Sequence, residues 1–201
     1  MITVAVESTA SVASVAVMKD REILGSRECA DLRKHSETIL PLLDELLDST
    51  GIKLEEIDSF CVDIGPGSFT GVRIGTASVN AIAHSLDKPV CGIYSLDILY
   101  AQAGCPDDAL VLIDAGRGKA YGCFYKAGQR AAEPVLEERS AFAEGLDAST
   151  VLIENEIPTA EGILKAQSAF GFSDGEAMPV YFAPSQAERM FEERRRGKGD
   201  K

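Results

Sequence analysis

One stretch of sequence decides the fold: Asp63-Ile64-Gly65-Pro66-Gly67-Ser68-Phe69-Thr70-Gly71-Val72-Arg73-Ile74-Gly75. The apolar run before it, residues 57–62, is typical of a buried strand, and residues 71–86 have helical spacing. Glycine allows a sharp turn between the two, and the hydroxyl of Ser68 or Thr70 can cap the helix. Such a junction either binds an anion at the helix N-terminus or serves as a tight turn before a closely packed helix.

The composition indicates a globular protein with an acidic surface. The 201 residues are 45% hydrophobic and 26% charged, which is enough for one large domain or two small ones. The net charge of −12 argues against tight nucleic-acid binding by the isolated chain. Five scattered cysteines without a C-x-x-C pair indicate free thiols in a reducing compartment. Because we find no cationic leader and no apolar run of about 20 residues, we expect a cytoplasmic protein without a membrane span.

The first half of the chain predicts three strands and then alternating helices and strands. The strands are expected at residues 2–6, 12–18, 22–28, 57–64 and 90–94, and the helices at 35–48, 71–86 and 96–103. The helix over residues 35–48 carries a wide apolar arc, so we expect it to bury more than one face. We expect its cap near Thr38, which places Pro41 in the first turn, and its end at Gly51.

The second half repeats the opening pattern of the first. An apolar strand at 109–114 ends in Asp114, as the first strand ends at Glu7, and a small-residue turn and a second strand follow each. The remaining elements are expected as a helical turn at 140–146, a strand at 151–154, a helix at 160–170 and a last strand at 180–182. The domains predicted from this pattern are an N-terminal lobe at 1–106, a shortened C-terminal lobe at 107–186 and a disordered tail at 187–201.

Paired βββαβα halves with acids at the first-strand tips are typical of α/β proteins of the actin-like ATPase (ASKHA, RNase H-like) fold. In those proteins the two acids hold Mg-nucleotide between the lobes. Glu7 and Asp114 are therefore candidates for a vestigial nucleotide cleft. The alternative is that both are ordinary surface acids at strand ends.

Other catalytic patterns are absent from the sequence. No Lys follows the last glycine of the Gly65–Gly71 turn, as a P-loop requires, and Ser68 does not lie in G-x-S-x-G. His35 and His84 are the only histidines and form no zinc pattern. We therefore predict no catalytic residue, no metal ligand and no cofactor. Gly71 and Gly75, one turn apart, instead provide a groove for a neighbouring backbone.

Several segments resemble the bacterial TsaB family, also called YeaZ. They are the Gly65–Gly75 string, His35-Ser-Glu-Thr-Ile-Leu-Pro-Leu-Leu43, Asp114 with the Arg117-Gly118 turn, and Pro179-Val-Tyr181 followed by Pro184-Ser-Gln-Ala-Glu188. They span nearly the whole chain in the family's order, and the glycine string is specific.

The resemblance implies a two-lobed actin-like subunit that has no catalytic activity alone. Such a subunit dimerises with the TsaD transferase and, with the TsaE ATPase, supports N6-threonylcarbamoyladenosine formation at tRNA position 37. It forms a homodimer when isolated and meets tRNA only through the complex. The family pairs through its first two helices, here Thr38–Leu47 and Thr70–Leu86. The expected partner interface is Ile39, Leu42, Leu43, Leu46, Gly71, Val72, Ile74, Gly75 and Ala81.

Two departures from the family bear on this expectation. The catalytic relative carries an H-x-x-x-H metal pair where this chain has residues 94–99 without histidine, and Glu7 stands where the family usually has Asp. One alternative function is an active actin-like ATPase or kinase that uses Glu7 and Asp114. Another is a glycopeptidase, for which the sequence offers neither a zinc site nor a nucleophile motif.

Overall fold

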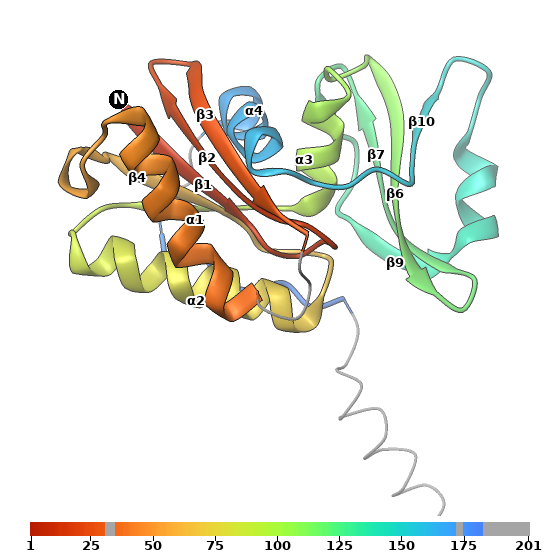
Figure 1. Ribbon diagram of the computed structural model, residues 1–201. Coiled ribbons are helices and arrows are strands. Elements are labelled where there is room, and N and C mark those ends of the chain that lie inside the picture. Colours follow the sequence, from red (N-terminus) through yellow and green to blue (C-terminus); the bar gives the residue numbers. More distant parts are fainter. Residues whose placement is uncertain (31–34, 172–174, 183–201) are drawn as a thin grey trace, which may run out of the picture.

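The computed structural model describes residues 1–30, 35–171 and 175–182, which form two β-sheets with helices around and between them (Figure 1). The first part of the chain contains β1 (Ile2–Glu7), β2 (Ala13–Lys19), β3 (Glu22–Cys29), α1 (His35–Thr50), η2 (Leu54–Glu56), β4 (Ser59–Asp63), α2 (Phe69–Ser85), β5 (Val90–Ile93) and α3 (Ser95–Gln102). The second part contains β6 (Asp108–Gly116), β7 (Lys119–Lys126), β8 (Gln129–Arg130), β9 (Val135–Glu138), η3 (Arg139–Gly145), β10 (Val151–Ile153) and α4 (Ala160–Phe170). The predicted tail at 187–201 and the motif at 184–188 lie outside the described residues.

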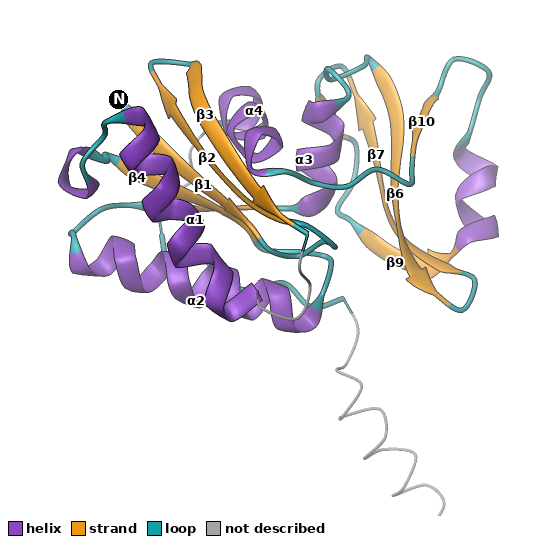
Figure 2. Cartoon of the chain, in the orientation of Figure 1, coloured by secondary structure: helices purple, strands orange, loops and turns teal. Residues whose placement is uncertain are grey.

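The first sheet has the strand order β3-β2-β1-β4-β5, in which β1 is antiparallel to β2 and parallel to β4. Alternate residues of β1 serve two cores: Val4 and Val6 pack with α1 and α2, whereas Ala5 packs with α3 and α4. Helices therefore cover both faces of this sheet (Figure 2). Strands buried on both faces require near-continuous apolar sequence, which β1, β2 and β4 have.

The second sheet repeats the arrangement of the first. Its order is β10-β6-β7-β8, and β9 also pairs with β7. Strand β6 is antiparallel to β7 and parallel to β10, as β1 is to β2 and β4. Residues Leu96, Leu99 and Tyr100 of α3 cover one face, and Phe142 of η3 packs on the other. The predicted duplication of an acid-tipped hairpin is thus present in the backbone.

Two segments that follow the second sheet in the chain pack on the first sheet. Helix α4 does not complete a second lobe, because Ala160, Ile163 and Leu164 are buried against the first sheet. Residues 175–182 also return to the first lobe, where Ala177 lies in the core that α1 and α2 cover. Residues 180–182 form no strand, although the Val180 amide donates to the Ile64 carbonyl.

Most predicted elements are present, with shifts at their ends. Helix α1 begins at His35, so Pro41 lies inside the helix and not in its first turn. Gly51 follows the helix with a φ of 70°, and Ser68 caps α2 by accepting from the Gly71 amide. Strands β8 and β9 were not predicted, because they are short and mostly polar. All five cysteines lie in the described part of the chain and form no disulfide.

Close backbone contact between α2 and the β1–β2 loop sets the position of α2. A Cβ atom on Gly71 would lie 1.9 Å from the Ser8 carbonyl oxygen, and one on Gly75 would lie 2.4 Å from the Ser8 hydroxyl. The Ser8 hydroxyl donates to the Gly71 carbonyl at 2.8 Å. The groove that the sequence predicts at these glycines exists, but this chain's own loop fills it.

We expect Gly71→Ala to destabilise the protein by at least about 2 kcal/mol, because the new methyl group meets fixed backbone. At a helix position with free space, a Gly→Ala change stabilises the fold by up to about 1 kcal/mol. The sign of the stability change therefore distinguishes a crowded position from an open one. Urea unfolding of the variant beside Thr70→Ala, a change at the exposed neighbouring residue, measures the difference. A stable Gly71→Ala protein would contradict this assignment of the groove.

Candidate functional site

Most of the predicted partner-interface residues lie inside the chain's own core. Ile39, Leu42, Leu43 and Leu46 of α1 and Val72 of α2 are all buried. The four α1 residues pack with the valines of β1 and β2. In this structure these side chains and the two glycines are covered by the chain itself. The wide apolar arc of α1 correctly predicted that the helix is deeply buried. The arc does not show whether the chain's own sheet or a second protein covers it.

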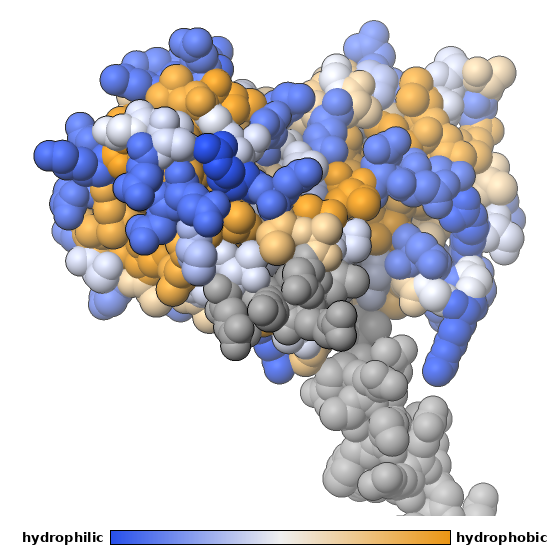
Figure 3. All heavy atoms as spheres, viewed as in Figure 1, coloured by the Kyte–Doolittle hydropathy of each residue, from blue (hydrophilic) through white to orange (hydrophobic). Residues whose placement is uncertain are grey.

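Two predicted interface residues remain near the surface: Ile74 is partly buried and Ala81 is exposed. The outer face of α1 and α2 includes the apolar residues Leu40, Pro41, Phe69, Ile74, Ala77 and Ala81, beside exposed polar residues such as Glu45 and Arg73. Leu40 is 54% exposed and Phe69 is 36% exposed. Figure 3 shows hydrophobic patches broken by hydrophilic residues on the side where these helices lie. Leu40 is not among the predicted interface residues. It lies outside the helical set 39, 42, 43 and 46, so this spacing could have identified it as an exposed leucine.

A small aromatic cluster ties the segment 175–182 to the start of α2. The Arg73 Nε donates to the Tyr181 hydroxyl at 2.8 Å, and the guanidinium carbon lies 3.9 Å from the Phe69 ring centroid. The Phe69 and Tyr181 rings lie 5.1 Å apart. The side chain of Asn80 holds the same segment by accepting from the Ala177 amide and donating to its carbonyl. The segment therefore borders the outer face of α1 and α2.

The two predicted cleft acids have opposite environments. Asp114 is exposed and accepts from the Gly116 amide at 3.0 Å in a local turn. Glu7 is 0% exposed, and its nearest acidic neighbour is Asp63, at the end of the adjacent parallel strand. Glu7 is therefore covered by the chain's own residues, whereas Asp114 faces solvent. Asp63, like Glu7, ends an apolar strand, and neighbouring parallel strands end at the same edge of a sheet. This pattern in the sequence could have predicted that the two acids lie together.

Hydrogen bonds connect the pair to the turn that opens α2. Asp63 Oδ1 accepts from the Gly65 amide and from the Ser95 hydroxyl, each at 2.7 Å. The Thr9 hydroxyl lies 2.8 Å from Glu7 Oε1 and 2.9 Å from Asp63 Oδ2. Burial raises the pKa of both carboxyls above the ordinary range, and the Asp63 charge raises the pKa of Glu7 further.

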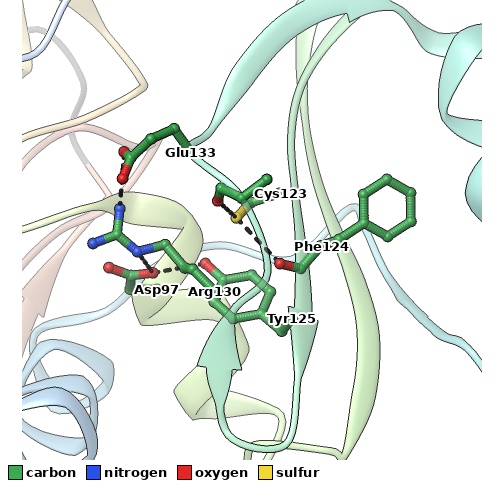
Figure 4. A network of polar contacts seen from close by, with 7 residues as sticks. Asp97, Cys123, Phe124, Tyr125, Arg130 and Glu133 are labelled. Carbon is green, nitrogen blue, oxygen red and sulfur yellow. Dashed lines mark hydrogen bonds and ion pairs between the residues drawn. The ribbon is translucent and has the colours of Figure 1, made fainter.

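A second polar network joins the two sheets (Figure 4). The Tyr125 hydroxyl of β7 donates to Asp97 Oδ1 of α3 at 2.7 Å, and the Arg130 Nε lies 3.5 Å from the same oxygen. Arg130 also pairs with Glu133 at 3.5 Å and lies over the Tyr94 ring. Burial raises the pKa of Asp97, while Tyr125 and Arg130 oppose the shift. These contacts hold the second sheet against α3.

The remaining surface offers few catalytic groupings. A depression of about 550 Å³ beside Arg130 is lined by Ala127, Gly128, Gln129, Arg130, Ala132, Glu133, Ala169 and Phe170. Within the described ranges, no group of three or more His, Cys, Asp or Glu residues is placed to hold a metal ion. None of the helices in the described part is long and apolar enough to cross a membrane.

Comparison with known proteins identifies relatives over most of the chain. The family model described as TsaD, tRNA N6-adenosine threonylcarbamoyltransferase, matches residues 28–188. The tRNA threonylcarbamoyladenosine biosynthesis protein TsaB of Haemophilus influenzae is 30% identical over 181 residues, which are 88% of this chain and 72% of the relative. An uncharacterized protein of Mycobacterium tuberculosis is 37% identical over 117 residues, 58% of this chain, and the match spans only 54% of that relative's length.

Among solved structures, YeaZ from Pseudomonas aeruginosa is similar to this chain with a TM-score of 0.76 and 26% identity. The similarity covers 90% of this chain and 99% of the YeaZ chain. The actin-like α/β fold predicted from the sequence is thereby confirmed.

We expect Tyr125→Phe to lower the free energy of unfolding by about 1–3 kcal/mol, because it removes the hydrogen bond to the buried Asp97. Thermal or denaturant unfolding checks this value. Tyr121→Phe is the matched control, since Tyr121 is a partly buried tyrosine of the same strand whose hydroxyl makes no hydrogen bond to the part of the chain described here. Equal stability of the two variants would show that the network does not hold the sheets together.

Proposed function

The chain belongs to the TsaB (YeaZ) family, and from this membership we propose that it is a non-catalytic subunit in the formation of N6-threonylcarbamoyladenosine in tRNA. Relatives from Haemophilus influenzae, Escherichia coli and Bacillus subtilis are named for biosynthesis of this nucleoside. The chain acts by binding a TsaD-like transferase, with a TsaE-like ATPase in the same assembly. Isolated, it forms a homodimer, and its compartment is the cytoplasm.

The burial of Glu7 supports this function over an active ATPase. A carboxylate that holds Mg-nucleotide has to reach the ligand, whereas Glu7 is enclosed by Thr9 and Asp63. The net charge of −12 supports a role in which tRNA contacts other subunits, because phosphate binding favours a basic surface.

The outer face of α1 and α2 is the proposed binding surface for the TsaD-like subunit. Ala77 and Ala81 lie four residues apart and therefore share one helix face, and their small side chains let a partner helix approach closely. Leu40 and Phe69 supply the larger apolar groups that anchor such interfaces. This arrangement of small and large exposed residues on paired helices is the observation that carries the proposal.

We expect the double variant Ala77→Arg/Ala81→Arg to bind a TsaD-like subunit at least about tenfold more weakly, a loss of about 1.4 kcal/mol. Two long charged side chains would hold the partner helix away, and both positions are exposed, so the variant should keep its thermal stability. Calorimetric titration with purified TsaD measures the affinity.

Val151→Arg/Leu152→Arg is the matched control, because it places the same two charges on exposed apolar residues of β10 in the other sheet. Unchanged affinity of the α2 double variant, or an equal loss in the control, would contradict the proposed surface. Leu43→Arg is unsuitable as a probe, since this leucine lies in the core and the charge would unfold the protein.

A further inference from the structure

The pairing of β1 with β4 places two acids side by side in the interior. Val6 is the register partner of Val62, so Glu7 and Asp63, the next residue of each strand, lie together at the carboxyl end of the sheet. Both residues are 0% exposed. Two negative charges this close and this far from water repel each other strongly, because the interior screens charge weakly.

The Thr9 hydroxyl lies between the two carboxyls. This hydroxyl carries one hydrogen but lies at hydrogen-bonding distance from an oxygen of each carboxyl. It can donate to only one of them, so it cannot stabilise two ionised carboxylates at once. The two carboxyls are close enough for the Asp63 charge to raise the pKa of Glu7.

The partners of each oxygen indicate where the proton resides. The two Asp63 oxygens accept from Gly65, Ser95 and Thr9, which suits an ionised carboxylate. Glu7 Oε1 accepts from the Thr9 amide at 2.5 Å and from the Ala10 amide at 3.1 Å, whereas Glu7 Oε2 is buried and has no hydrogen-bond partner among the described residues. Glu7 Oε2 is therefore the oxygen best suited to carry the proton.

We infer that Glu7 and Asp63 hold one proton between them at neutral pH, and that this proton keeps the Gly65–Gly67 turn and the first turn of α2 in place. Asp63 binds the Gly65 amide, and the Thr9 carbonyl accepts from the Ser68 amide at 2.8 Å. Loss of the proton would put two charges in one buried site and loosen both connections. This inference concerns the chain alone and does not depend on the proposed partner.

The elements packed around the pair contain few other charges. Helix α2 presents Gly71 and Gly75 to the β1–β2 loop, and α3 contributes Ser95. Among the described residues, Asp97 of α3 is a further acid near the pair, and the Asp63 charge raises its pKa. Of the groups described, the shared proton therefore dominates the charge of this site.

The inference predicts a stability that falls as pH rises. In the unfolded chain Glu7 releases its proton near its ordinary pKa of about 4.3, whereas the folded chain keeps the proton to higher pH. Between those two values the folded chain binds more protons, so the folded-to-unfolded ratio falls about tenfold for each pH unit. Below the unfolded-state pKa the proton contributes its full stabilisation. Above the folded-state pKa the stability no longer changes with pH through this pair.

Glu7→Gln tests this directly, because its amide can donate to Asp63 at any pH. We expect the variant to lack the tenfold-per-unit fall that the wild type shows in urea unfolding series from about pH 5 upward. Asp114→Asn, at the corresponding acid of the second sheet, is the matched control and should keep the wild-type slope. Equal slopes in wild type and Glu7→Gln would overturn the inference.

A measurement on the unmodified protein decides the same question if Glu7→Gln does not fold. Side-chain carboxyl ¹³C NMR at neutral pH should show one protonated signal for the Glu7–Asp63 pair. Amide exchange at Gly65 and Ser68 should accelerate once that signal titrates. Two fully ionised carboxyls at neutral pH, or exchange that is independent of the titration, would show that no shared proton holds the turn.

Discussion

The fold depends on the contact between the β1–β2 loop and the start of α2. The Ser8 backbone occupies the space that a side chain at residue 71 would need, and its hydroxyl fills the space at residue 75. With α2 held at this distance from the first sheet, α1 can lie beside it and bury its leucines against β2 and β3. The turn, the helix pair and the outer face of α1 and α2 all follow from this single close approach.

The two sheets share a topology but differ in how they are covered. The first sheet has helices on both faces, whereas the outer face of the second has Phe142 of η3. Helix α4 follows the second sheet in the chain and packs on the first. The packing of α4 on the first sheet therefore connects the two halves of the chain. The contacts of Asp97 with Tyr125 and Arg130 form a second connection between them.

The sequence predicted the helices and strands well, but it predicted the contacts between them less well. The strands of the first sheet, the duplication and the cap at Ser68 could be read from local pattern, because burial and turn chemistry are local properties. The covering partner of the α1 leucines, the filling of the Gly71 groove and the pairing of Glu7 with Asp63 depend on contacts between distant segments. The apolar period of α1 is equally consistent with its own sheet and with a second protein, so it could not separate the two.

The position of α4 also has a consequence for the order in which the protein can fold during its synthesis. Ile163 and Leu164 complete the core around Ala5 and Cys61, and Ala177 completes the other core of the same sheet. The first strands to be synthesised therefore keep exposed apolar faces until α4 and Ala177, near the end of the described chain, have been made. Such long-range contacts slow folding and leave apolar surface open to aggregation in the meantime. Nascent chains should accordingly depend on chaperones until about residue 180 has emerged.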